Sequence, residues 1–136
     1  MLQWSEEYST GIKDIDQQHK LLFKFVNVLE EEIKKGSGAE VIQKAVDFME
    51  EYAREHFRFE EMCMCGVNCA ETNNNKEAHG KFIEKLKEFD SKAKTQSNQQ
   101  EVVIEMHRFV EDWLKTHLLN IDSKLKQCWP QKAKGV

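Results

Sequence analysis

Residues 42–60 read IQKAVDFMEEYAREHFRFE, and the spacing of their apolar positions decides the fold class. One face of this segment is apolar and ends in a histidine and a carboxylate. Its members are Ile42, Ala45, Val46, Met49, Ala53, His56 and Glu60. They recur every three or four residues, which indicates an amphipathic helix, and His56 and Glu60 stack on one face because they are four residues apart. The segment predicts a helix over about 39–65.

Three further segments have apolar residues at helical spacing. They cover about 16–35, 73–94 and 99–118. Asp16 is a suitable N-cap for the first of these helices. An arm of residues 1–15 precedes the helices, and a short segment of residues 119–136 follows them. Because short connections make successive helices antiparallel, we expect residues 1–136 to form one all-α domain, an up-down-up-down four-helix bundle with an extended N-terminal arm and a short C-terminal segment.

The histidines occupy corresponding depths in these predicted helices. His19 lies near the start of the first helix, His56 and Glu60 near the end of the second, His79 near the start of the third and His117 near the end of the fourth. In an antiparallel bundle all of these positions lie at the same end. A single inward histidine is more often an ordinary core residue, but four of them with carboxylates are costly to bury without a metal. The pattern therefore predicts a metal site in the bundle core.

Asp122 needs a local irregularity to join this site. It follows His117 by five residues, a rotation of roughly 140° on a regular helix. We therefore expect the backbone between Leu118 and Ile121 to depart from regular α-helix, so that the Asp122 carboxylate points inward.

Composition limits the class of protein. The chain has 136 residues, of which 40% are hydrophobic and 32% charged, and a net charge of −4. This charge disfavours nucleic acid or an anionic membrane as a partner, and no apolar run approaches the roughly 20 residues of a membrane helix. The start of the chain does not read as a signal peptide, so we expect a cytoplasmic protein with reduced thiols.

Three stretches together carry a family resemblance. They are GIKDIDQQHK at 11–20, HFRFEE at 56–61 and WLKTHLLNID at 113–122. In combination they resemble the signatures of hemerythrins, and of bacterial hemerythrins in particular. The resemblance covers nearly the whole chain and includes Trp4 in the arm. It implies a non-haem di-iron protein that binds O2 reversibly.

The resemblance also implies the ligands. One iron would take His19 and His56, and the other His79 and His117. Glu60, Asp122 and an oxo or hydroxo group would bridge the two irons. Imidazole suits iron, and carboxylates can span two metals. The apolar O2 pocket of the family would correspond to Leu22, Phe57, Trp113, Leu114 and Leu118.

Asn75 departs from the family pattern, in which a further histidine stands at this position. An amide oxygen is a weaker donor to iron than imidazole. The outcomes left open are direct ligation by the amide, a water in the vacant place, a weakly held metal, or substitution by Glu71 one turn earlier. A second open position predicts faster autoxidation than in a fully ligated relative.

The cysteines Cys63, Cys65 and Cys69 form a cluster with C-x-C-x₃-C spacing, unlike common zinc or iron–sulfur patterns. Their plain interpretation is ordinary loop thiols. The alternative is redox sensing or reduction close to the irons, since Cys63 lies about one turn beyond Glu60.

The sequence thus predicts O2 binding for transport, storage, delivery or sensing, and favours this role over catalysis. Other small ligands of such a site are peroxide, nitric oxide and azide. An alternative, encouraged by Asn75 and the thiols, is a di-iron enzyme acting on peroxide or nitric oxide. A third hypothesis, a sensing module for a partner protein, is disfavoured because no output domain is present in these residues. The oligomeric state is left open.

Overall fold

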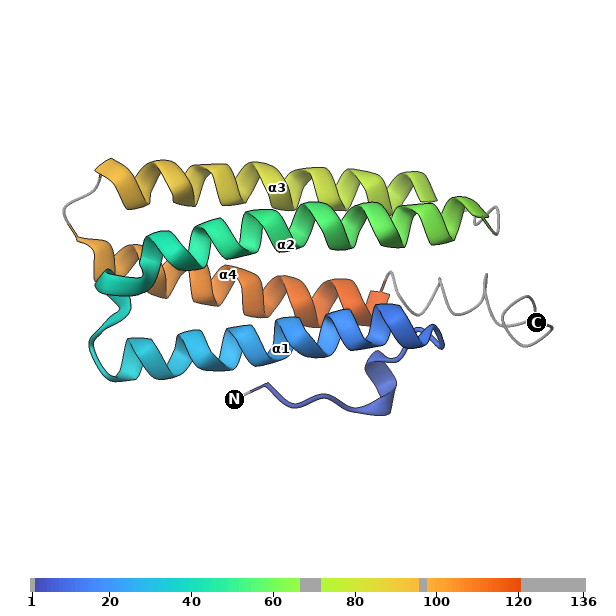
Figure 1. Cartoon of the computed structure of the whole chain (residues 1–136), viewed down its shortest axis with the longest axis horizontal. Coiled ribbons are helices and arrows are strands. Elements are labelled where there is room, and N and C mark those ends of the chain that lie inside the picture. Colours follow the sequence, from blue (N-terminus) through green and yellow to red (C-terminus); the bar gives the residue numbers. More distant parts are fainter. Residues whose placement is uncertain (1, 67–71, 96–97, 121–136) are drawn as a thin grey trace.

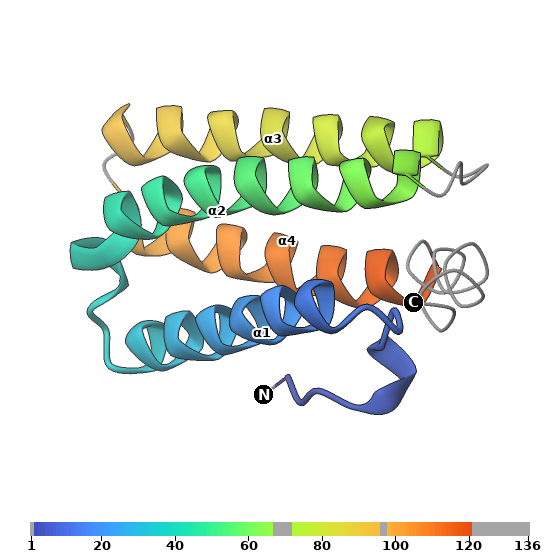
Figure 2. The same ribbon diagram turned by 45° about the vertical axis from the view of Figure 1, so that its right-hand side comes forward.

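Four antiparallel α-helices form the molecule in the computed structural model, which describes residues 2–66, 72–95 and 98–120. The helices are α1 (Lys13–Lys34), α2 (Gly38–Gly66), α3 (Thr72–Thr95) and α4 (Gln99–Asn120). They lie lengthwise with their directions alternating, and α2 and α3 run side by side (Figures 1 and 2). The predicted all-α four-helix bundle is confirmed. Of the expected C-terminal segment, residues 119–120 extend α4, and the rest lies outside the described residues.

The apolar faces of the helices meet in one core. Its largest fully buried apolar side chains are Phe82, Phe89, Ile15, Met49, Leu86, Met106, Leu114 and Leu118. Most of the exposed positions on the helices are charged or polar, as an amphipathic helix requires. Among the described helices, none combines the length and apolar character that a membrane crossing needs.

The first helix begins earlier than expected, and Asp16 is not its N-cap. The helix starts at Lys13 after Ile12, and Asp16 lies within the first turn. Its carboxylate instead accepts hydrogen bonds from Ser9 Oγ at 2.7 Å and from Thr10 N and Oγ1, both at 2.8 Å. Asp16 therefore fastens the end of the arm to the helix. The prediction was wrong because an aspartate in the first turn and an aspartate N-cap produce the same sequence signal.

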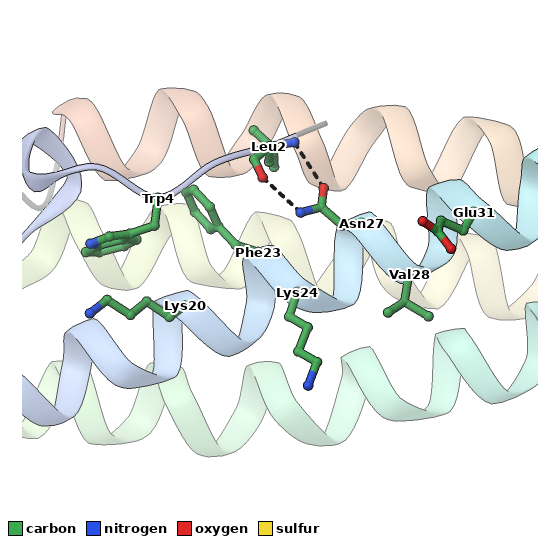
Figure 3. A pocket seen from close by; sticks show the side chains of 8 residues that line it. All are labelled: Leu2, Trp4, Lys20, Phe23, Lys24, Asn27, Val28 and Glu31. Carbon is green, nitrogen blue, oxygen red and sulfur yellow. Dashed lines mark hydrogen bonds between the residues drawn. The ribbon is translucent and has the colours of Figure 1, made fainter.

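The arm packs along α1 and contains a short 3-10 helix, η1 (Glu6–Tyr8). The Asn27 side chain pins its beginning by accepting from Leu2 N at 3.0 Å and donating to Leu2 O at 2.8 Å (Figure 3). Trp4 packs edge-on against Phe23, and the Lys20 ammonium lies 5.4 Å from the centre of the Trp4 ring. The arm is thus anchored by both polar and aromatic contacts.

Two glycines shape the turn between α1 and α2 for different reasons. Gly36 has φ +79°, a conformation that L side chains rarely adopt. Gly38 begins α2 where it approaches α4 closely, since a Cβ there would lie 2.5 Å from Val103 Cγ1 and 2.8 Å from Gln100 Oε1. The glycine at position 38 therefore allows the start of α2 to pack closely against α4.

Candidate metal centre

Helices α1 and α3 begin, and α2 and α4 end, at the same end of the bundle (Figure 1). The histidines of the four helices come together near this end. His19, His56, His79 and His117 are all at most 5% exposed, and Glu60 is completely buried among them. His19 Nε2 and His56 Nε2 are 2.9 Å apart. The convergence expected from the depth of each histidine is thus present in the structure.

Glu60 lies at the centre, with one carboxylate oxygen facing each pair of imidazoles. Its Oε2 atom is 3.3 Å from the Nε2 atoms of both His19 and His56. Its Oε1 atom is 3.5 Å from His79 Nε2 and 3.9 Å from His117 Nε2. Two groups of potential ligand atoms result, each spanning less than 4.8 Å, and Glu60 belongs to both. A carboxylate shared in this way is suited to bridging two metal ions.

Hydrogen bonds to residues outside this cluster fix the ring orientations of two histidines. His79 Nδ1 donates to Glu61 Oε2 at 2.7 Å, and His56 Nδ1 donates to the side-chain oxygen of Gln18. Because a carboxylate and an amide oxygen only accept hydrogen bonds, Nδ1 of each ring carries a proton. The Nε2 atoms of both rings therefore point toward the centre, an arrangement that is common for histidines that bind metals.

Charge in the cluster is unbalanced without a cation. Burial lowers the pKa of His19 to about 4 and also lowers the pKa of His117, so these rings are neutral near pH 7. Burial alone would raise the pKa of Glu60, but the surrounding imidazoles outweigh it and hold that pKa well below its usual range. The core thus holds a buried carboxylate among imidazoles, and Glu60 Oε2, His79 Nε2 and His117 Nε2 have no hydrogen-bond partner among the described residues. Such a set fits metal cations.

Aromatic and aliphatic side chains wall the half of the centre that holds His79 and His117. The Phe57 ring stacks on His79 with ring centres 3.8 Å apart, and Trp113 stacks on His117 at 4.1 Å. The other residues expected in the apolar pocket are fully or almost fully buried: Leu22, Leu114 and Leu118. Phe57 and Trp113 therefore each cover one face of these two imidazoles, and the three leucines belong to the buried core.

Asn75 is completely buried one turn before His79 and points at the same carboxylate. Its Nδ2 atom donates to Glu60 Oε1 at 2.6 Å. In this arrangement the amide is a hydrogen-bond donor to the oxygen that also faces His79 and His117. Direct ligation through the amide oxygen would need the amide to turn over.

Several expected residues fall outside the described part of the chain or of its side chains. Asp122, Glu71 and Cys69 lie outside the described residues, and of Cys65 only the helical backbone is described. Cys63 is a free thiol at the end of α2, and burial, with Glu60 and Asp14 nearby, raises its pKa. It therefore stays protonated near neutral pH, which does not favour the reactive-thiol alternative.

The irregular backbone expected after Leu118 is absent as far as the structure describes it. Residues 118–120 are helical, and α4 ends at Asn120. The regular hydrogen bonding of α4 continues here because nothing in residues 118–120 interrupts a helix, as a proline or glycine would. The prediction for this part was wrong, and Ile121 lies outside the described residues.

Sequence reasoning missed the residues behind the histidines. Glu61 and Gln18 accept the Nδ1 protons of His79 and His56. Tyr52 stacks on His56, and its hydroxyl donates to the backbone oxygen of Gln18. The available signal was chemical: a buried metal-binding histidine needs an acceptor for its second nitrogen, and Gln18 and Glu61 each adjoin a candidate ligand.

Comparison with known proteins supports the family resemblance. A family model described as the hemerythrin HHE cation-binding domain matches residues 10–129. A bacteriohemerythrin from Clostridium acetobutylicum is 31% identical over 125 residues, which make up 90% of this chain and 96% of that protein. Another, from Methylococcus capsulatus, is 30% identical over 129 residues, or 94% of this chain and 96% of its own length.

Solved structures agree with the sequence relatives. A crystal structure of wild-type hemerythrin matches 94% of this chain and 97% of its own, with a TM-score of 0.79 and 28% sequence identity. Fold, clustered histidines and relatives lead to one conclusion: this chain belongs to the hemerythrin family and is a bacterial hemerythrin-like protein.

Proposed function

We propose that this protein holds two non-haem irons and binds O2 reversibly. The observation that carries the proposal is the position of Glu60, which belongs to two groups of buried ligand atoms at once. Membership of the hemerythrin family supports iron as the metal. When bound, a pair of ferrous ions supplies the two electrons that reversible O2 binding requires.

In this proposal, each side chain of the centre either holds a metal or orients a residue that does. His19 and His56 hold one metal, His79 and His117 hold the other, and Glu60 bridges them. Asp122 is the second bridging carboxylate in this proposal, on the strength of its place in the 113–122 motif. Gln18 and Glu61 keep two of the imidazoles in the tautomer that presents Nε2 inward.

The apolar side chains around the second metal position would keep O2 binding reversible. Phe57 and Trp113, stacked on His79 and His117, keep water and its protons away from the second metal position. Leu22, Leu114 and Leu118 extend this wall. A pocket that excludes water and protons favours release of O2 itself rather than of peroxide.

Asn75 acts in this proposal as a positioning residue for Glu60. Its hydrogen bond to Oε1 draws electron density from the oxygen nearest His79 and His117. The second metal would therefore have one imidazole fewer and an open position. Faster autoxidation than in a fully ligated relative is expected because water or an anion can enter at that open position.

Optical spectroscopy through repeated O2 cycles tests the proposal. The iron-loaded protein is reduced without air, exposed to O2 and then purged with argon. We expect a visible band that appears with one O2 for each pair of irons and disappears on purging. Irreversible oxidation in the first cycle, or no optical change at all, would refute reversible binding.

A second candidate function is turnover of peroxide or nitric oxide. The open position created by Asn75 favours it, because an additional small ligand could reach the second metal. Steady consumption of either substrate in the presence of a reductant, with many turnovers for each chain, would establish this activity. A carrier instead binds stoichiometrically and shows little turnover.

A further inference from the structure

A groove between α2 and α3 lies directly outside the metal centre. The helices run antiparallel, and each contributes one stripe at helical spacing. The lining residues are Arg54, Phe57, Arg58 and Glu61 from α2, with Lys76, His79, Gly80 and Ile83 from α3. The hollow has a volume of about 290 Å³, at the lower end of the range for small-molecule sites.

The charge of this groove is opposite to that of the whole chain. It carries three cationic side chains and one carboxylate, in a protein whose net charge is −4. Within residues 2–66, 72–95 and 98–120, no ion pair involves Arg54, Arg58 or Lys76, whereas Glu61 is held by His79 Nδ1 at 2.7 Å. The cations are thus available to an anion from solution, and arginine offers paired N–H donors that match an oxyanion.

Gly80 is the second observation that points to a ligand. It lies inside α3, where glycine costs roughly 1 kcal/mol of stability relative to alanine. Its backbone does not require glycine, and a Cβ there would meet nothing within 4 Å. Neither backbone conformation nor close packing explains why residue 80 is a glycine. Because Gly80 has no side chain, the groove stays open beside His79.

We propose that this groove binds a small oxyanion through Arg54, Arg58 and Lys76, with Gly80 keeping the site open. The site is separate from the metal positions and does not depend on O2 binding. Its inner wall is the hydrogen bond between Glu61 and His79, so a bound anion lies next to the contact that orients one candidate metal ligand. The site therefore gives the metal centre a way to respond to anions.

The test is titration of inorganic phosphate into metal-free and iron-loaded protein, followed by calorimetry and by backbone amide NMR on the metal-free form. We expect saturable binding of one phosphate to both forms. The shifted amides should belong to residues 54–61 and 76–83. Binding to the iron-loaded form alone would place the anion on the metal and overturn the proposal, as would no binding to either form.

Matched variants distinguish phosphate binding in the groove from non-specific electrostatic attraction of phosphate to the protein surface. Arg58→Gln and Lys76→Gln should each weaken phosphate binding about tenfold, whereas Arg108→Gln and Lys81→Gln, which remove charges outside the groove, should leave it unchanged. Gly80→Leu retains every charge but fills the groove, and it should abolish binding. If Gly80→Leu binds as well as the parent protein, or if all four charge variants lose affinity equally, the proposed site does not exist.

Discussion

Glu60 carries a buried negative charge, and among the described residues it faces imidazoles rather than any lysine or arginine. An uncompensated charge in a protein core costs several kcal/mol. A bound cation would remove this cost by neutralising the Glu60 carboxylate. Asn75 modifies this residue by donating a hydrogen bond to one of its oxygens. In the proposed site, this amide would make the two metal positions unequal.

Replacing Asn75 tests that inequality. Asn75→His supplies an imidazole to the second position and removes the hydrogen bond to Glu60, so autoxidation should slow by about tenfold, the scale typical of changes near metal ligands. Decay of the O2-bound spectrum after rapid mixing measures this rate. Unchanged decay, with the extra imidazole shown to bind the metal, would mean that Asn75 does not control autoxidation.

Asp16 illustrates a residue whose role depends on contacts beyond its own helix. Asp16→Ala should destabilise the protein by about 1.5–3 kcal/mol, because it removes three hydrogen bonds to a charged acceptor from Ser9 and Thr10. Asp14→Ala is the control, since Asp14 is also in the first turn of α1 but exposed. Urea denaturation of both variants should show a loss for Asp16→Ala well above the roughly 0.3–1 kcal/mol of a helix-dipole effect.

At the scale of the elements, the sequence predicted most of what the structure shows. The stripe from Ile42 to Glu60 has one face at a period of 3.6 residues, and a long helix is the only common element that buries such a face. The depth of each histidine along its helix then determined where the imidazoles meet. Local periodicity was sufficient for these conclusions.

Other features depend on contacts between elements, which periodicity does not contain. Glu61 lines the groove between α2 and α3 rather than the core, so its partner His79 is known only once the two helices are placed together. The Asn27 amide likewise finds the backbone of Leu2 through the path of the arm. The start of α1 was misplaced because Asp16 bonds to the arm.

Two glycines within helices should respond oppositely to alanine. Gly38→Ala should destabilise the protein by about 1–3 kcal/mol, since its Cβ would press on Val103 where α2 meets α4. Gly80→Ala should stabilise it by about 1 kcal/mol, because the added methyl meets nothing. Thermal denaturation of the two variants in parallel checks this contrast. A stabilising Gly38→Ala would show that α2 and α4 are less closely packed than they appear here.

At the scale of the whole molecule, the four helices bury a cluster of polar groups that could hold metal ions. The metal-free protein should consequently be sensitive to acid. His19 has a pKa of about 4 when folded against 6.5 as its ordinary value, so the unfolded chain binds more protons between these values. Glu60, whose pKa is also depressed, acts in the same direction at lower pH.

Stability of the metal-free protein should therefore fall as pH drops from about 6.5 to about 4, by roughly 3 kcal/mol from His19 alone. Urea denaturation at a series of pH values measures the change. His19→Gln, which removes one of the two buried rings with a lowered pKa, should reduce the slope of the curve, and His117 should account for part of what remains. A metal-free protein whose stability is constant across this range would contradict neutral burial of His19.

Metal content combined with X-ray absorption at the iron edge tests the shared carboxylate most directly. The parent protein should hold two irons for each chain, separated by about 4 Å or less. Glu60→Gln, with its fold verified by circular dichroism, should lose the short iron–iron distance and fall below two irons for each chain. A parent protein that takes up a single metal, or a Glu60→Gln variant that keeps both irons at the same separation, would contradict a paired site built around Glu60.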